Sequence, residues 1–309
     1  MASYHNVTEF AGKVVVDWDP AETVTDPADP IYRIALDYES GQRGTTWPDK
    51  FSAFLEHSAS KGATGLVVGI WESWTRQQEL ADRVVEAIVS AREKLPDLTA
   101  IYFGDIVSEE CEISWIAQTD VSPLFTAYPA LEYFIVRGGN GLSLGTPRLP
   151  ALRSLVVETG GMSAEIVHSI SKSDLPALEH LELWLGDSSY GATSTVEDLE
   201  PILSGRLFPN LKYLGLRDSE FSDDIAAALV TAPILERLEI LDLSMGTLSD
   251  KGMEALLASP NLTRLKKLDI NFHYCSDAMV ARLEALDIEV DAGDQQEEDD
   301  DYRYVAVGE

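Results

Sequence analysis

The sequence is poor in basic residues. Its 309 residues include 23 lysines and arginines against 53 aspartates and glutamates, which gives a formal net charge of −30 at pH 7. Proteins that bind nucleic acid or an anionic membrane neutralise phosphates with lysine and arginine, and this chain would repel such polyanions at long range. The charge therefore favours a protein or peptide partner, and in particular one that carries a basic segment. The other interpretation is that the charge serves solubility alone.

Cysteines and long apolar runs are scarce as well. Cys111 and Cys275 lie far apart and outside any Cys-x-x-Cys pair, so neither a disulfide framework nor a catalytic thiol is indicated. No stretch reaches the roughly 18 apolar residues of a membrane-spanning helix. The first residues lack the basic start and apolar core of a secretion signal. We expect a cytoplasmic protein with buried cysteines and no membrane contact.

The motifs of common catalytic and phosphate-binding sites are missing too. The sequence contains no Gly-x-Ser-x-Gly, no His-Glu-x-x-His and no phosphate-loop motif ending in Gly-Lys-Ser/Thr. Residues 138–141 (Gly-Gly-Asn-Gly) follow an expected strand but lack the lysine and the helix start of a phosphate loop. The sequence therefore predicts no catalytic residue, no cofactor and no metal site, and hence a non-enzymatic protein.

What the chain does contain is a repeated apolar pattern. The form Leu-x-x-Leu-x-Leu, with aliphatic or aromatic substitutes, recurs seven times in register. Its last two apolar residues are two positions apart and so point to the same side of a short strand. Successive copies begin 21 to 33 residues apart, which is the length of a strand-and-helix repeat. The copies begin at Leu98, Leu131, Leu152, Leu178, Leu211, Leu238 and Leu265.

Segments of helical periodicity separate the copies. In residues 249–257, Met253, Leu256 and Leu257 recur at helical spacing, and Ser249 or Asp250 can cap the helix start. A helix after each strand makes neighbouring strands parallel, and each unit needs its neighbours to bury its leucines. The sequence predicts an α/β fold, a right-handed leucine-rich-repeat solenoid with parallel strands on the concave face and helices on the convex face.

The helix sequence SDKGMEALLAS and the period near 27 resemble the ribonuclease-inhibitor-like subclass of leucine-rich-repeat proteins over roughly residues 90–290. That subclass usually has Asn or Cys three residues after the last leucine, where the side chain satisfies backbone groups. Stacked repeats arrange these side chains as an asparagine ladder, which is absent from this sequence. We expect backbone turns or water to satisfy the same backbone groups here. The opening HNVTEFAGKVVVDW and the closing RYVAVGE also resemble a group of bacterial cytoplasmic repeat proteins, which implies no particular activity. The ladder positions hold Ile106, Gly139, Gly160, Gly186, Ser219, Gly246 and His273.

The N-terminal segment, residues 1–60, lacks the repeat. Residues 14–18 and 31–36 have the composition of two strands, separated by a turn region from Pro20 to Pro30. A helix is expected over residues 48–60. Such a β-hairpin and helix would cap the open end of the solenoid, which otherwise exposes strand edges and leucines.

Residues 61–290 are expected to hold seven to nine irregular repeats. The first is a degenerate copy at residues 63–68, followed by a helix over about residues 72–94. Residues 291–301 form an acidic linker. Residues 302–309 alternate as a strand does, and we expect them to fold back onto a sheet edge or a surface groove. A disordered tail is the competing interpretation.

The residues beside the motif leucines should line the concave face. Aromatic and arginine side chains, which dominate protein interfaces, gather in the middle repeats together with histidine and glutamate. The alternative is that these side chains only pair across neighbouring strands. The predicted binding surface comprises Tyr133, Arg137, Glu158, His180, Glu182, Trp184, Tyr213 and Arg217, and a secondary acidic patch comprises Asp242, Asp269 and His273.

These features predict a monomeric scaffold that binds a protein or peptide through its concave face. One alternative is an accessory subunit that presents a substrate to a separate modifying enzyme. Another is a metal-binding protein or hydrolase that uses His180 with Glu158 and Glu182. One histidine and two carboxylates are few for a zinc site, which generally has three or more protein ligands.

Overall fold

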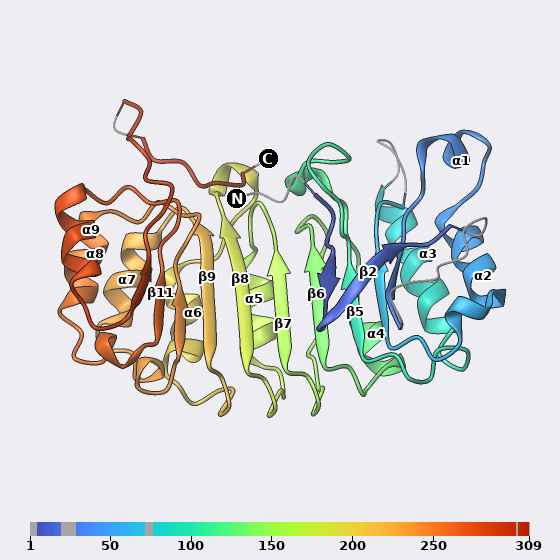
Figure 1. Cartoon of the computed structure of the whole chain (residues 1–309), viewed down its shortest axis with the longest axis horizontal. Coiled ribbons are helices and arrows are strands. Elements are labelled where there is room, and N and C mark those ends of the chain that lie inside the picture. The colour runs from blue at the N-terminus through green and yellow to red at the C-terminus, as the bar shows by residue number, and fades with distance from the viewer. Residues whose placement is uncertain (1–4, 20–28, 72–76, 301, 309) are drawn as a thin grey trace. The chain divides into compact units, whose positions relative to one another are not determined.

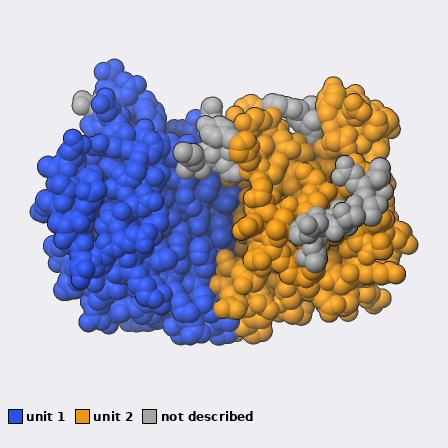
Figure 2. Space-filling model, in the orientation of Figure 1, with its two compact units in different colours: residues 1–2, 155–172, 176–309 blue, residues 3–154, 173–175 orange. Residues whose placement is uncertain are grey.

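The structure is a computed structural model that describes residues 5–19, 29–71, 77–300 and 302–308. The chain forms two compact units (Figure 2). Unit 2 comprises residues 3–154 and 173–175, and the rest of the described chain belongs to unit 1. Within each unit, helices lie along one face of a sheet whose strands follow one another in sequence order (Figure 1).

Unit 2 begins with a tight hairpin and continues as parallel strands. Strand β2 pairs in parallel with β3, and the parallel pairing continues through β4 and β5 to β6. Its described strands are β1 (Glu9–Phe10), β2 (Lys13–Asp17), β3 (Ile31–Ile34), β4 (Gly65–Val68), β5 (Ala100–Phe103) and β6 (Tyr133–Arg137), and its described helices are α1 (Tyr38–Gln42), α2 (Trp47–Glu56), α3 (Gln77–Ser90) and α4 (Ser122–Ala127).

The N-terminal hairpin differs from the predicted one. Strands at 14–18 and 31–36 were expected to pair as a hairpin, but β2 and β3 run parallel. The antiparallel partner of β2 is β1, and the turn between them is Ala11-Gly12, both with positive φ (48° and 74°). Two left-handed residues make the turn that matches the twist of paired strands. The expected turn region from Pro20 to Pro30 falls largely outside the described residues, as does the start of the helix expected at 72–94.

The hairpin also covers a different surface from the one expected. Phe10 packs against Tyr102 and Val67 in one buried cluster, so β1 lies on the helix-free face of the unit 2 strands. The prediction had placed the hairpin over the open end of the solenoid. The ring centroids of Phe10 and Tyr102 are 6.1 Å apart. The predicted helix at 48–60 is α2, which begins at Trp47 after a capping box made by Thr46 and Asp49.

Unit 1 is the regular part of the repeat. Strands β8 to β12 pair in parallel, each with the next, and a helix follows each strand from β7 to β11. Its strands are β7 (Ser154–Glu158, in which Ser154 is assigned to unit 2), β8 (His180–Gly186), β9 (Tyr213–Ser219), β10 (Ile240–Asp242), β11 (Lys267–Asp269) and β12 (Glu289–Asp291), and its helices are α5 (Ala164–Ser171), α6 (Val196–Leu203), α7 (Ser222–Leu229), α8 (Asp250–Leu257) and α9 (Asp277–Glu284).

The motif residues form the core, as predicted. Each apolar residue of the seven Leu-x-x-Leu-x-Leu copies is at most 3% exposed. A strand whose alternate residues are buried this way packs one face on the helices and presents its other residues on the face without helices. The predicted fold class, a leucine-rich-repeat solenoid of parallel strands and helices, is confirmed. Within the described residues, no helix has the length and apolar character needed to cross a membrane.

Hydrogen bonds between aspartate and serine side chains, which we call the aspartate–serine ladder, connect successive repeats in place of the missing asparagines. The carboxylate of Asp223, in the first turn of α7, accepts hydrogen bonds from the backbone N–H (2.8 Å) and hydroxyl (2.7 Å) of Ser249, which caps the next helix. Asp250 does the same for Ser276 one repeat later, with both distances 2.7 Å. Side chains at the helix starts therefore join successive repeats and satisfy backbone and hydroxyl donors of the serine caps.

Backbone groups complete the turns, as the sequence led us to expect. Asp218, Met245 and Phe272 each lie two residues after the last apolar residue of a motif copy, where the strand ends, and have φ of 52°, 69° and 61°. Each donates its backbone N–H to a carbonyl of the following repeat, at distances between 2.8 and 2.9 Å. Left-handed backbone in residues other than glycine is strained by roughly 1–2 kcal/mol each, so these three turns are held by the hydrogen bonds around them.

Candidate functional site

The helix-free face of unit 1 carries a row of carboxylates. The strand register places Glu182, Gly215 and Asp242 opposite one another on β8, β9 and β10, and it continues to Asp269 on β11 and Asp291 on β12. We call the four carboxylates, Glu182, Asp242, Asp269 and Asp291, the acidic row. Because these residues alternate with the buried leucines, their side chains lie on the face that the helices do not cover.

Glu182 and Asp242 are the two buried members of the row, 8% and 5% exposed. Glu182 makes the larger set of contacts with aromatic and basic side chains. The side chain of Glu182 is 10% exposed and pairs with Arg217 on the neighbouring strand, with Glu182 Oε1 and Arg217 Nη1 2.5 Å apart. The indole N–H of Trp184 donates to the same carboxylate oxygen at 2.7 Å. The Arg217 guanidinium also lies over the Trp184 ring, 5.4 Å from its centroid. A charged hydrogen bond and a cation–π contact thus fix all three side chains.

Arg217 uses each of its nitrogens inside the protein. Besides the pair with Glu182, Nε donates to the hydroxyl of Ser244 at 2.9 Å and lies 3.4 Å from the carboxylate of Asp242. Its remaining nitrogen contacts the sulfur of Met245 at 2.9 Å. Each nitrogen of Arg217 therefore has a partner on β8–β10 or in the turn after β10, and the guanidinium joins neighbouring strands of the sheet face.

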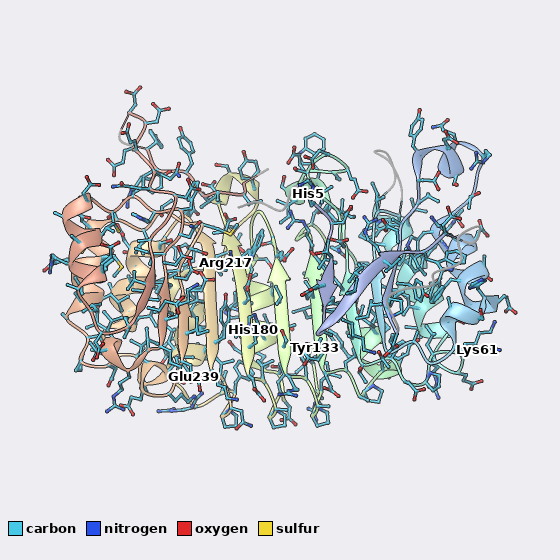
Figure 3. All side chains as sticks on the ribbon, viewed as in Figure 1. His5, Lys61, Tyr133, His180, Arg217 and Glu239 are labelled. Carbon is cyan, nitrogen blue, oxygen red and sulfur yellow. The ribbon has the colours of Figure 1, made fainter. Side chains whose placement is uncertain are left out.

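Tyr213 and His180 form the wider part of the cluster. The Tyr213 hydroxyl lies 2.6 Å from Asp242 and 3.2 Å from Glu182, and so connects the two carboxylates across β9. The His180 ring stacks on the Tyr213 ring with centroids 3.9 Å apart, and its Nε2 lies 3.5 Å from Glu182. Figure 3 shows His180 and Arg217 on the neighbouring strands β8 and β9.

Gly215 makes this arrangement possible. A Cβ at position 215 would lie 3.1 Å from Glu182 Cγ and 3.1 Å from the Tyr213 ring. The lack of a side chain at the centre of the row leaves the space into which Glu182 and the Tyr213 hydroxyl extend.

Electrostatics in the cluster follow from burial and pairing. Burial raises the pKa of Glu182, but the hydrogen bond with His180, the charge of Arg217 and the Trp184 N–H outweigh it and bring the pKa to about 2. Burial lowers the pKa of Arg217, but the charges of Glu182 and Asp242 raise it by more, so the pKa lies above its usual value. Burial raises the pKa of Asp242 more than Arg217 lowers it. Burial, with the charges of Glu182 and Asp242, also raises the pKa of Tyr213.

The secondary acidic patch predicted from the sequence divides in the structure. Asp242 belongs to the cluster around Arg217. Asp269 lies beside it in the acidic row and pairs with Lys267 at 2.9 Å. His273 is fully buried, and its Nδ1 accepts the backbone N–H of Cys275 while Nε2 lies 3.0 Å from the carbonyl of Ala292. His273 is therefore a structural residue of a turn and contributes nothing to an exposed patch.

The predicted binding surface divides in a similar way. Glu158, His180, Glu182, Trp184, Tyr213 and Arg217 belong to unit 1, whereas Tyr133 and Arg137 belong to unit 2. Tyr133 packs against the apolar cluster around Phe10 and Tyr102. Arg137 is 4% exposed and donates through Nε to the carbonyl of Ile106 at 3.0 Å. Trp184 is only 5% exposed. Glu158 is partly exposed at the end of β7.

Sequence reasoning missed a buried ion pair in unit 2. Arg33 on β3 is 5% exposed, and its Nε lies 2.6 Å from the carboxylate of Asp105, which follows β5. Asp105 also accepts the backbone N–H of Val7 at 3.2 Å, which attaches the segment before β1 to the sheet. The only signal in the sequence was a charged residue inside an otherwise apolar strand.

The residues proposed for metal chemistry do not form a ligand set. No group of three or more histidine, cysteine or carboxylate side chains with metal-binding geometry occurs in the part of the chain that the structure describes. His180 and Glu182 are in contact, but His180 is stacked on Tyr213 and Glu182 is engaged by Arg217. What the face offers chemically is negative charge and aromatic surface.

Comparisons with known proteins add one informative relative. A crystal structure of a Bacteroides fragilis protein matches with 32% sequence identity and a TM-score of 0.83, over 91% of this chain and 78% of that one. An internalin from Listeria monocytogenes aligns with 14% identity and a TM-score of 0.31, over 75% of each chain, which is too weak to support any argument. Neither a family model nor a curated protein matches the sequence.

Proposed function

The chain belongs to the same protein family as the Bacteroides fragilis relative, and we propose that it is a non-enzymatic scaffold that binds a basic protein segment. The observation that carries the proposal is the acidic row, in which carboxylates occupy four of the five consecutive register positions on β8–β12. Sheet faces of repeat proteins of this kind are commonly used for protein binding. The formal net charge of −30 favours approach of a cationic partner.

The outer end of the row is its more exposed part and has two carboxylates for one lysine. The side chain of Asp291 is 43% exposed and lies 3.7 Å from Lys267, and that of Asp269 is 17% exposed and lies 2.9 Å from the same lysine. The inner carboxylates are held by Arg217 and Tyr213. We therefore assign partner contact to Asp269, Asp291, His180 and Tyr213, and a supporting role to Glu182, Trp184 and Arg217.

The proposal also includes a repeat subclass, a cellular location and an oligomeric state. A helix after each strand from β7 to β11 supports the ribonuclease-inhibitor-like subclass. Two buried free cysteines support a reducing, cytoplasmic location, and we take the active form to be a monomer. An accessory subunit that presents a substrate to an enzyme would use the same face, so it differs from the first proposal in what happens after binding.

The test uses fluorescence anisotropy with a labelled ten-residue peptide of alternating lysine and alanine, and its glutamate–alanine counterpart. The full chain should bind the basic peptide, and binding should weaken as salt is raised. Asp269→Asn with Asp291→Asn removes two charges but keeps an acceptor for the backbone, and should weaken binding by about tenfold. The matched control is Asp224→Asn on α7, whose side chain is 63% exposed. Equal binding by the double variant and the control would refute the proposal.

A further inference from the structure

The last described residues lie across the end of β9 and the turn that follows β10 in unit 1. Ala306 donates its backbone N–H to the carbonyl of Met245 at 2.8 Å, and Val307 donates its N–H to the carboxylate of Asp218 at 2.9 Å. Residues 302–309 were expected to alternate as a strand does and to fold back onto a sheet edge or a surface groove. The described part, residues 302–308, does fold back, but it forms no strand.

The backbone of this segment is recognised in a way that does not depend on its side chains. The hydroxyl of Tyr274, in the turn region after β11, accepts the N–H of Tyr304 at 2.8 Å and donates to the carbonyl of the same residue at 2.9 Å. With the Ala306 and Val307 bonds, several main-chain groups of one extended stretch are satisfied. Main-chain pairing supplies affinity in peptide recognition, and side-chain anchors supply specificity.

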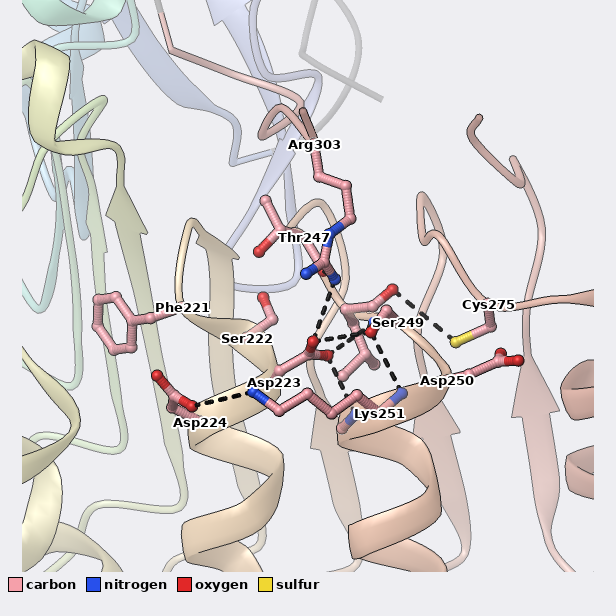
Figure 4. Close-up of polar contacts among 12 residues, drawn as sticks. Phe221, Ser222, Asp223, Asp224, Thr247, Ser249, Asp250, Lys251, Cys275 and Arg303 are labelled. Atoms are coloured by element: carbon pink, nitrogen blue, oxygen red, sulfur yellow. Dashed lines mark hydrogen bonds and ion pairs between the residues drawn. The ribbon is translucent and has the colours of Figure 1, made fainter. Parts of the chain in front are cut away.

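Two side chains anchor the segment, four residues apart. Arg303 lies 3.1 Å from the Asp223 carboxylate and donates to the carbonyl of Thr247 at 2.6 Å. Figure 4 shows the Arg303 guanidinium reaching Asp223, which also holds the cap of the next helix. Val307 is 5% exposed. A Cβ on the following Gly308 would lie 2.6 Å from the Tyr190 ring, so the chain passes close to that ring.

The receiving surface is built from residues that the fold holds in strained or buried states. Asp218 and Met245, which bind Val307 and Ala306, are two of the three left-handed turn residues. Asp223 has a side chain that is 9% exposed. Strained backbone and buried carboxylates persist where surrounding structure holds them, and such features gather at binding sites. We call Asp218, Asp223, Met245, Thr247 and Tyr274 the turn-edge surface.

We propose that the turn-edge surface is a peptide-binding site, which the chain's own segment 302–308 occupies and for which a partner's extended segment competes. The competing segment carries an arginine followed four residues later by an aliphatic residue, as Arg303 and Val307 do here. This goes beyond the acidic row, since it uses the turns and not the sheet face. Residues 292–300 tether the segment to the solenoid. The Gln295 side chain donates to the carbonyl of Cys275, and the backbone N–H of Gln296 donates to the carbonyl of His273.

The tether determines how strongly the attached segment competes with a free peptide for the turn-edge surface. A short linker gives an attached segment an effective concentration on the order of millimolar. A free peptide must therefore compete poorly against the wild-type chain and well against a chain whose own segment has been released. Arg303→Glu with Val307→Asp releases it, because a carboxylate would face Asp223 and a charge would enter the buried Val307 position.

The experiment uses the full chain in both forms and, as probe, a fluorescein-labelled peptide with the sequence of residues 299–309. The released variant should bind the probe at least about tenfold more tightly than the wild type. The same peptide carrying Arg303→Glu and Val307→Asp should bind neither. Tyr302→Ser is the matched control variant, because the Tyr302 side chain is exposed, and it should behave as the wild type.

Two results would overturn the proposal. The first is a folded released variant that binds the probe no better than the wild type. The second comes from hydrogen exchange on the wild-type chain, which needs no variant to fold: the Ala306 and Val307 amide protons exchanging as fast as in the free peptide would show that the segment is not bound. Both outcomes are independent of the acidic row, which remains intact in every protein used.

Discussion

Glu182 and Arg217, on neighbouring strands of unit 1, form an ion pair that is closed off by the indole of Trp184. The carboxylate oxygen that Arg217 contacts at 2.5 Å also accepts the Trp184 N–H at 2.7 Å. Removing one member of a buried pair leaves the other member charged and without compensation, whereas a solvent-exposed pair contributes little to stability. The two cases can be compared directly within this chain.

We expect Arg217→Met to destabilise the protein by about 3–5 kcal/mol, because Glu182 and Asp242 would both lose their cation. The measurement is urea-induced unfolding at pH 7 followed by circular dichroism. The control is Lys251→Met, whose side chain is 78% exposed and lies 3.9 Å from Asp224. Its free energy of unfolding should equal that of the wild type. An equally small effect of both substitutions would mean that the Arg217 pair is not stabilising.

The low pKa of Glu182 predicts a specific pH dependence. A carboxyl group whose folded pKa is about 2, against 4.5 in the unfolded chain, stabilises the fold at pH values above 4.5. That contribution is lost as the pH falls from 4.5 towards 2, and its full size is about 3 kcal/mol. Glu182→Gln lacks it. The difference in unfolding free energy between wild type and Glu182→Gln should therefore be constant from pH 7 to about 4.5 and decrease below that. A difference that stays constant down to pH 2.5 would contradict the assignment.

The aspartate–serine ladder between helices gives a third prediction. Asp223→Ala removes the acceptor for Ser249, for the N–H of Gly252 (3.2 Å) and for Arg303 (3.1 Å), which leaves partly buried donors unsatisfied. We expect a loss of about 2–4 kcal/mol in the free energy of unfolding. The adjacent Asp224 is 63% exposed, with Lys251 3.9 Å away, so Asp224→Ala should have almost no effect. Thermal and urea unfolding of the two variants side by side show whether the contacts of Asp223 with the next repeat and with Arg303 stabilise the fold.

The contrast between these two neighbouring aspartates shows where sequence reasoning stops. Both belong to the same Ser-Asp-Asp run at the start of a helix, and either could serve as a first-turn acid. Only the stacking of the next repeat places Ser249 against Asp223 and leaves Asp224 in solvent. The serine–aspartate pairs at spacing 27, which continue at Ser249-Asp250 and Ser276-Asp277, were nevertheless present in the sequence as a signal of the ladder.

The same distinction applies to the candidate site. The alternation of leucines was sufficient to assign Glu182, Tyr213, Arg217 and Asp242 to one face, because side chains two apart on a strand share a side. It could not show that Arg217 pairs with both Glu182 and Asp242, or that Tyr133 packs against the cluster around the hairpin residue Phe10. Those facts depend on contacts between residues far apart in the sequence.

The sequence by itself determined the class of fold and the identity of the core. Its repeated leucines require stacked neighbours to be buried, and its periodicities fix which segments are strands and which are helices. Tertiary structure alone decided that β2 and β3 run parallel, since the same two apolar segments are compatible with either direction. It also decided that Arg303 and Val307 meet Asp223 and Asp218, because burial and charge pairing across repeats depend on where distant turns lie in space.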